Sequence, residues 1–101
     1  MLYLVESRAS IDQGNAIDAG EGPGAVFAKI AERFHPLAIY GSPSRRQIFM
    51  IVNLDTPAEM AELMYVLTWF TCGEPTFTPV MDPVIFAEAI TNAKRIFEPP
   101  T

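Results

Sequence analysis

Glu6 is the side chain in this sequence that is best suited to proton transfer. It lies near the end of an opening strand predicted over Leu2 to Ser7, on the same face as Leu2 and Leu4. A carboxylate beside an apolar surface is suited to general acid or base catalysis. The alternative is a residue at the end of a strand that simply reaches water, so both interpretations stay open.

His35 is the only histidine and a second candidate for acid or base catalysis near neutral pH. It ends a helix predicted from about Ala25 and precedes Pro36, a place where histidine commonly interacts with the helix dipole instead. Candidate ligand-binding residues are Ser7, Tyr40, Arg46, Asn53 and Trp69. Tyr40, Asn53 and Arg46 are polar companions for Glu6, while Trp69 lies in an aromatic-rich helix and fits a pocket, a core or an interface.

The sequence argues against metal and nucleotide sites. One histidine, one cysteine and scattered carboxylates give no ligand cluster at zinc spacing. The Asp12 to Asp18 stretch lacks the alternating carboxylates of a calcium loop, and no Lys-Ser or Lys-Thr follows the glycines of Gly20 to Gly24. We therefore predict no metal and no cofactor, and we expect Cys72 to be a small buried residue.

The clearest structural signal is the run from Gln47 to Glu59. Its first eight residues are mainly apolar on both faces of the predicted strand. Thr56, Pro57 and Glu59 then form the pattern of a capped helix start, and this helix is predicted to run to about Thr71.

Other elements follow from the same reasoning. Two further strands are predicted over Leu37 to Gly41 and Thr76 to Val80, and a final helix is predicted from Pro83, with Asp82 as its N-cap. Pro79 places the last strand at an edge or a bulge. The polar and glycine-rich residues 9–24 are predicted to be an irregular, mobile connection.

This order predicts an α+β protein with the ferredoxin-like β-α-β-β-α-β arrangement, a four-stranded antiparallel sheet and an added C-terminal helix. We expect a single domain over residues 1–98 and a tail over 99–101. Both helices of such a fold cover one face of the sheet, yet the third strand is apolar on both sides. The open face is therefore expected to pack on another copy.

The composition restricts the classes of molecule that the protein is expected to bind. Half of the 101 residues are hydrophobic, only 19% are charged, and the net charge is −5. The apolar surplus favours an interface, whereas the acidic balance argues against nucleic acid and anionic membranes. A lone cysteine, the lack of a secretory signal pattern and the lack of a long apolar span predict a cytoplasmic protein.

The opening Met1 to Val5 strand, the Asn53 to Pro57 connection and the Thr78 to Asp82 segment resemble the dimeric α/β-barrel superfamily. In that superfamily two ferredoxin-like protomers oppose their sheets around a shared lumen. The chain is most similar to an uncharacterised small-protein family within it, and more distantly to muconolactone isomerases and antibiotic-biosynthesis monooxygenases. The haem-degrading members use an Asn where this chain has Ser7, and their axial histidine has no counterpart on the second helix, which argues against haem.

The resemblance implies a homodimer, or a higher oligomer, that binds a small apolar or aromatic molecule or serves as a scaffold around an apolar lumen. The alternative is a cofactor-independent isomerase, cyclase or monooxygenase acting on a small aromatic or lactone-like substrate, with Glu6 or His35 moving the proton. A third possibility is a purely structural protein whose opposed sheets leave no pocket.

Overall fold

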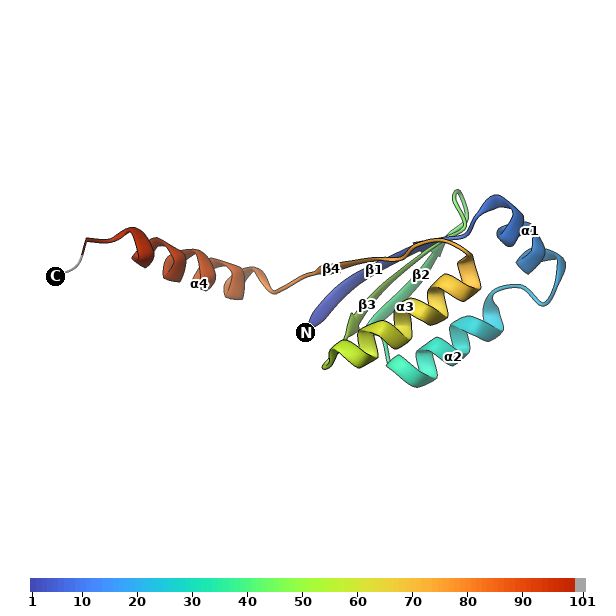
Figure 1. Cartoon of the computed structure of the whole chain (residues 1–101), viewed down its shortest axis with the longest axis horizontal. Helices are drawn as coiled ribbons and strands as arrows, with labels where there is room; N and C mark the ends of the chain where they lie inside the picture. Colours follow the sequence, from blue (N-terminus) through green and yellow to red (C-terminus); the bar gives the residue numbers. More distant parts are fainter. Residues whose placement is uncertain (100–101) are drawn as a thin grey trace.

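The computed structural model describes residues 1–99 and contains one sheet with helices on one side of it (Figure 1). The strands are β1 (Leu2–Arg8), β2 (Ala38–Ser42), β3 (Gln47–Asn53) and β4 (Thr76–Pro79). The helices are α1 (Ile11–Ala19), α2 (Gly24–Phe34), α3 (Pro57–Thr71) and α4 (Pro83–Lys94), followed by the short 3₁₀ turn η1 (Arg95–Phe97). Apart from Pro99, the tail predicted over 99–101 lies outside the described residues.

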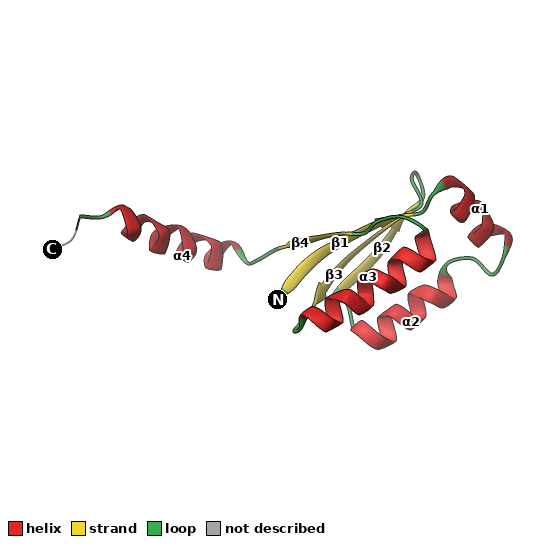
Figure 2. Cartoon of the chain, in the orientation of Figure 1, coloured by secondary structure: helices red, strands yellow, loops and turns green. Residues whose placement is uncertain are grey.

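The sheet has the strand order β2-β3-β1-β4, and every neighbouring pair is antiparallel. Because β1 and β2 both run antiparallel to β3, they are parallel to each other with β3 between them. Helices α2 and α3 lie side by side over one face (Figure 2). The predicted α+β class and four-stranded antiparallel sheet are confirmed, and Pro79 lies on an edge strand as predicted.

The core lies between the sheet and these two helices. Alternation along each strand sends Val5, Ile48, Met50 and Val52 towards the helices, where they are almost completely buried. Ile30 and Phe34 of α2 and Leu63 and Leu67 of α3 meet them from the other side.

The predicted capped start of α3 is confirmed. The Thr56 hydroxyl accepts a hydrogen bond from the Glu59 amide at 3.1 Å, and Pro57 occupies the first helical turn. The helix ends at Cys72, whose φ of 54° is left-handed and whose amide donates to the Thr68 carbonyl. This cap leaves Cys72 exposed, so the predicted burial of that residue is wrong.

The irregular connection predicted over residues 9–24 is also wrong, because Ile11–Ala19 form helix α1. The Ser10 hydroxyl caps the helix by accepting from the Gln13 amide at 3.1 Å. The Gln13 side chain then donates to the Phe70 carbonyl at 2.8 Å. These contacts attach α1 to the end of α3 and offset the low helix propensity of Gly14.

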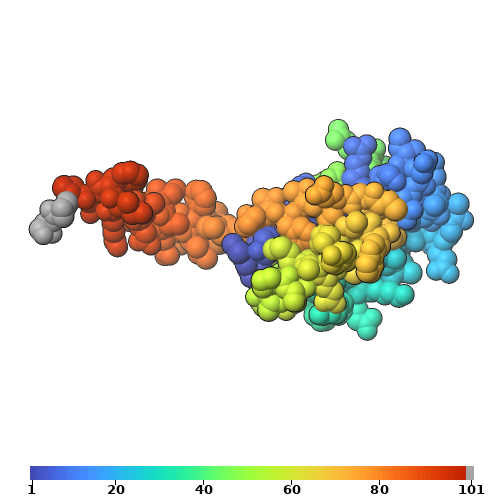
Figure 3. All heavy atoms as spheres, in the orientation of Figure 1, coloured from blue at the N-terminus to red at the C-terminus, as the bar shows by residue number. Residues whose placement is uncertain are grey.

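Helix α4 extends away from the rest of the chain (Figure 3). It starts as predicted, with the Asp82 carboxylate accepting from the Val84 amide at 2.8 Å. None of its residues is buried, and the molecule measures 68 × 25 × 20 Å as a result. No helix in the described part of the chain is both long and apolar enough to cross a membrane.

Two leucine substitutions test where the core lies. Leu63 is 0% exposed and Leu37 is 74% exposed. We expect Leu63→Ala to lower the free energy of unfolding by about 2 to 5 kcal/mol because it leaves a cavity, whereas Leu37→Ala should change it by about 0.5 kcal/mol or less. Urea unfolding followed by circular dichroism measures both, and equal losses would contradict the core described above.

Candidate functional site

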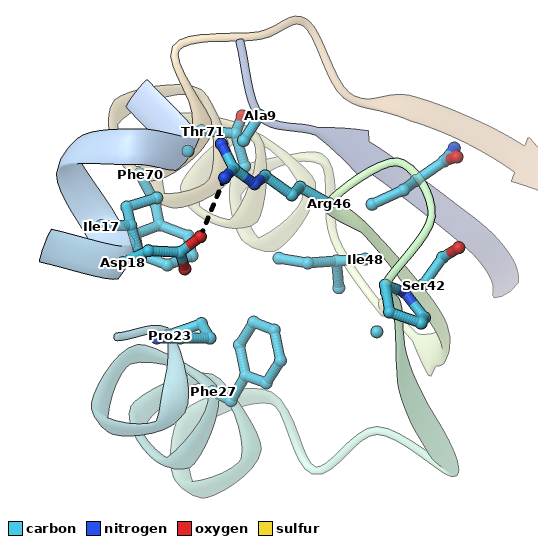
Figure 4. A pocket seen from close by; sticks show the side chains of 14 residues that line it. Ala9, Ile17, Asp18, Pro23, Phe27, Ser42, Arg46, Ile48, Phe70 and Thr71 are labelled. Carbon is cyan, nitrogen blue, oxygen red and sulfur yellow. Dashed lines mark ion pairs between the residues drawn. The ribbon is translucent and has the colours of Figure 1, made fainter. Parts of the chain in front are cut away.

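A cavity of about 550 Å³ opens at the end of the sheet where α1, the start of α2, the turn between β2 and β3, and the end of α3 meet (Figure 4). Its lining is mostly apolar, with a few polar side chains. The lining residues are Ala9, Gly14, Ile17, Asp18, Pro23, Phe27, Gly41, Ser42, Pro43, Arg46, Gln47, Ile48, Phe70 and Thr71.

Two aromatic rings form one wall. Phe27 comes from α2 and Phe70 from the last turn of α3, and their ring centroids lie 6.4 Å apart at an interplanar angle of 74°. Such an edge-to-face pair is a favourable aromatic contact. Gly41 of β2 lies next to Phe27 and has no side chain; a Cβ there would lie 3.8 Å from the Phe27 ring. The missing side chain keeps the cavity open between β2 and α2.

Arg46 is the cationic side chain of the lining. Its Nη2 forms an ion pair with Asp18 at 3.1 Å, and its Nη1 donates to the Asn15 side-chain oxygen at 2.8 Å and to the Ile11 carbonyl at 3.4 Å. These partners all belong to α1. Arg46 therefore ties the β2–β3 turn to α1 and places the ion pair at the cavity (Figure 4).

Gly14 makes this contact sterically possible. A Cβ at position 14 would lie 2.6 Å from both Cδ and Nη1 of Arg46, which is too close for unstrained atoms. Sequence reasoning predicted Arg46 as a ligand-binding residue but missed α1, and with it the roles of Gly14 and Asp18. The Ser10-x-x-Gln13 pattern is a helix-start signal that would have indicated α1.

Glu6, Tyr40 and Asn53 lie on the opposite, open face of the sheet. The register pairs Glu6 with Phe49 on one side and Thr76 on the other, and Tyr40 pairs with Phe49 from β2. Asn53 lies at the other end of β3 and accepts from the N-terminal ammonium group at 2.9 Å. It pairs with Leu2, four residues and about 13 Å along β1 from Glu6, so Glu6 and Asn53 share a face but not a contact.

Ser7 lies on the helix-covered face and is almost fully buried. Its hydroxyl lies 3.0 Å from that of Thr71, which itself donates to the Leu67 carbonyl and accepts from the Gly73 amide. The Thr71 proton is thus in use, so Ser7 is the donor between them. Ser7 joins β1 to α3 and does not line the cavity.

His35 and Trp69 lie away from the cavity and away from the open sheet face. His35 ends α2 in a left-handed conformation, with φ of 49°, and its amide donates to the Ala31 carbonyl at 3.0 Å. Its side chain is exposed. Trp69 is 72% exposed on the outer side of α3, beside Tyr65. Neither residue lines the cavity.

Within residues 1–99, no group of three histidine, cysteine or carboxylate side chains is arranged to hold a metal ion. No protein-family model matches the chain, and no curated protein matches it. The resemblance to the dimeric α/β barrels therefore stays a prediction.

The close contact between Gly14 and Arg46 predicts that Gly14→Ala changes amide hydrogen exchange in opposite directions in the native protein and in Arg46→Ala protein. In the native protein, Gly14→Ala should speed amide hydrogen exchange in α1, because the new methyl group displaces Arg46 from Asp18 and Asn15. In Arg46→Ala protein, the same change should slow exchange by up to about fivefold, because alanine favours the helix by about 1 kcal/mol over glycine. Gly20→Ala, where a Cβ meets only ordinary contacts, is the control. The same sign in both backgrounds would contradict the proposed contact.

Proposed function

We propose that this protein binds a small, largely apolar molecule in the cavity between α1, α2 and the β2–β3 turn. The observation that carries the proposal is the cavity itself, about 550 Å³ in volume with an aromatic wall. Binding sites for small molecules in proteins commonly enclose about 300 to 1,000 Å³ and combine apolar walls with a few polar groups. The lining described above has this composition.

The ligand chemistry follows from the lining. Phe27 and Phe70 favour a flat aromatic or alicyclic body. Arg46 favours a single anionic group, because a guanidinium binds a carboxylate or sulfonate through two parallel hydrogen bonds. In the free protein Asp18 forms an ion pair with Arg46, so a bound ligand anion takes the place of the Asp18 carboxylate. Both side chains of the ion pair are substantially exposed, and exchange of such a pair costs little.

We further propose that the chain has the ferredoxin-like arrangement and forms a homodimer as an α/β barrel. The strand order, with β3 inserted between the parallel strands β1 and β2, supports the first part. The second part is supported by the open sheet face, where Leu2, Leu4, Phe49 and Ile51 alternate with the buried residues of β1 and β3 and are partly exposed. A second sheet would cover this apolar surface.

The open face also favours a second candidate function. Glu6 lies among Leu4, Phe49 and Thr76, so opposed sheets would enclose a carboxylate in an apolar chamber. This is the setting for the cofactor-independent isomerase, cyclase or monooxygenase activity considered above. A cytoplasmic location belongs to the same proposal and is supported by the single Cys72, which has no partner for a disulfide within the chain.

Filling the cavity tests the ligand site. Gly41→Leu projects a side chain towards Phe27, whereas Gly24→Leu makes the same change where no atom lies within 4 Å of the new Cβ. With the aromatic anion anilinonaphthalene sulfonate as the probe, Gly41→Leu should weaken binding at least tenfold, and Gly24→Leu should leave it unchanged. Fluorescence titration measures both affinities. Equal affinity in the two variants, with both folded by circular dichroism, would place probe binding elsewhere.

A charge on the open face tests the homodimer. Phe49→Glu puts a carboxylate beside Glu6 and opposite the same pair in a second copy, so it should weaken association at least tenfold. Leu37→Glu adds the same charge at an exposed site outside the sheet and is the control. Sedimentation equilibrium gives the mass of each variant. A dimer of undiminished affinity in the Phe49→Glu protein would remove the sheet face from the interface.

A further inference from the structure

Helix α4 is amphipathic although it contacts no core. At about 100° per residue, Ile85, Ala89 and Ala93 share one side with Phe86 and Ile90. The other side carries Glu88, Thr91 and Arg95, together with the exposed Val84 near the start of the helix. The large apolar side chains are open to water, with exposed fractions of 55% for Ile85, 56% for Phe86 and 45% for Ile90. We call α4 and η1 together the C-terminal arm.

This arm needs a partner for physical reasons. An isolated helix of about 12 residues is marginally stable in water, and most helices in proteins are held by packing of an apolar side. None of the residues of α4 or η1 is buried. Ile96 and Phe97 extend the apolar side into η1 and are the most exposed large hydrophobic side chains of the described chain. An apolar side of this kind marks an interaction surface.

The body of the protein carries a matching surface on α3. Tyr65 and Trp69 lie one helical turn apart on its outer side, with ring centroids 5.6 Å apart and exposed fractions of 51% and 72%. We call these two side chains the aromatic patch. Tyrosine and tryptophan dominate the binding energy of protein interfaces, because they bury a large area at a low cost in conformational entropy.

The area that the arm can bury indicates a second copy rather than an unrelated protein. The five large apolar side chains of the arm are 45% to 88% exposed and can each bury about 100 Å² more, which gives about 500 Å² on the arm and a similar area on the surface it covers. One arm on another protein thus buries about 1,000 Å², less than the 1,200 to 2,000 Å² of stable interfaces. Two arms exchanged within a two-fold pair bury about 2,000 Å².

The charge of the arm is also compatible with a second copy of the chain as its partner. The whole chain is acidic, with a net charge of −5, so a charged arm would be repelled or attracted by a second copy over a long range. The arm itself, residues 83–97, has one acidic residue, Glu88, and two basic residues, Lys94 and Arg95. Its net charge is therefore +1, and the acidic remainder of a second copy attracts it weakly.

We propose that the C-terminal arm packs its apolar side against the aromatic patch of a second copy of this chain. Each copy offers one arm and one patch, so a symmetric pair satisfies both. The contact is separate from the cavity and from the open sheet face. It extends the proposed homodimer but does not depend on ligand binding.

Trp69 is the only tryptophan, so its fluorescence reports on the patch directly. Phe86→Ser with Ile90→Ser removes the centre of the apolar side, and Ala87→Ser with Thr91→Ser alters the opposite side as the control. These positions contact no core, so neither variant should unfold the body. We expect the first variant to shift Trp69 emission to longer wavelength and to weaken self-association at least tenfold, while the control behaves like the native protein.

A mixing experiment distinguishes docking between copies from docking within one copy. The Phe86→Ser, Ile90→Ser protein keeps Trp69 but has a defective arm, and Trp69→Phe protein has an intact arm but no tryptophan. The two are unfolded and refolded together. Docking between copies restores the short-wavelength emission, because the intact arm covers Trp69 of the other copy.

Two outcomes would overturn the proposal. Emission that is the same in the native and arm-defective proteins means that the arm does not cover Trp69. Emission that differs between them but is not restored by mixing means that the arm docks within its own chain. Neither outcome affects the ligand site, which the Gly41→Leu titration tests by itself, and Phe49→Glu separately reports on the sheet face.

Discussion

The whole structure depends on the alternation of side chains along β3, which is apolar on both faces while helices cover only one. Ile48, Met50 and Val52 are buried under α2 and α3, and this contact forms the core. Phe49 and Ile51 must then point to the other side, because successive residues of a strand face opposite ways. A protein with this strand has an apolar surface that its own helices do not cover, and Glu6 lies on that surface beside Phe49.

The cavity arises from a different constraint, the attachment of α1 at the end of the sheet. Three links hold the helix: the Ser10 amide to the Thr71 carbonyl, the Gln13 side chain to the Phe70 carbonyl, and Arg46 to Asp18. All three join segments that are distant in sequence. They leave space between α1, α2 and the β2–β3 turn, beside Gly41, which has no side chain. The same arginine that holds α1 faces the cavity, so the proposed ligand binding would be coupled to the position of α1.

Three features of the described chain are suited to binding partners: the cavity, the open sheet face and the C-terminal arm. The cavity lies within one chain and suits a small molecule, whereas the open sheet face and the C-terminal arm are broad apolar surfaces that suit a protein partner. This division separates the proposed ligand site from the proposed contacts between copies. It also accounts for a composition in which half of the residues are hydrophobic although the core of one chain is small.

Local signals in the sequence determined most of the elements. The Thr56-Pro57 and Asp82-Pro83 helix starts, the two-sided apolar strand and the edge position of Pro79 act within a few residues, so the α+β class and the four strands were predictable. The site was not. Arg46 and Asn53 were predicted as polar companions of Glu6, yet Arg46 binds a helix that the glycine-rich composition concealed, and Asn53 lies at the other end of the strand pair from Glu6. Only tertiary structure decided these placements, because they depend on strand register and on hydrogen bonds between segments far apart in the chain.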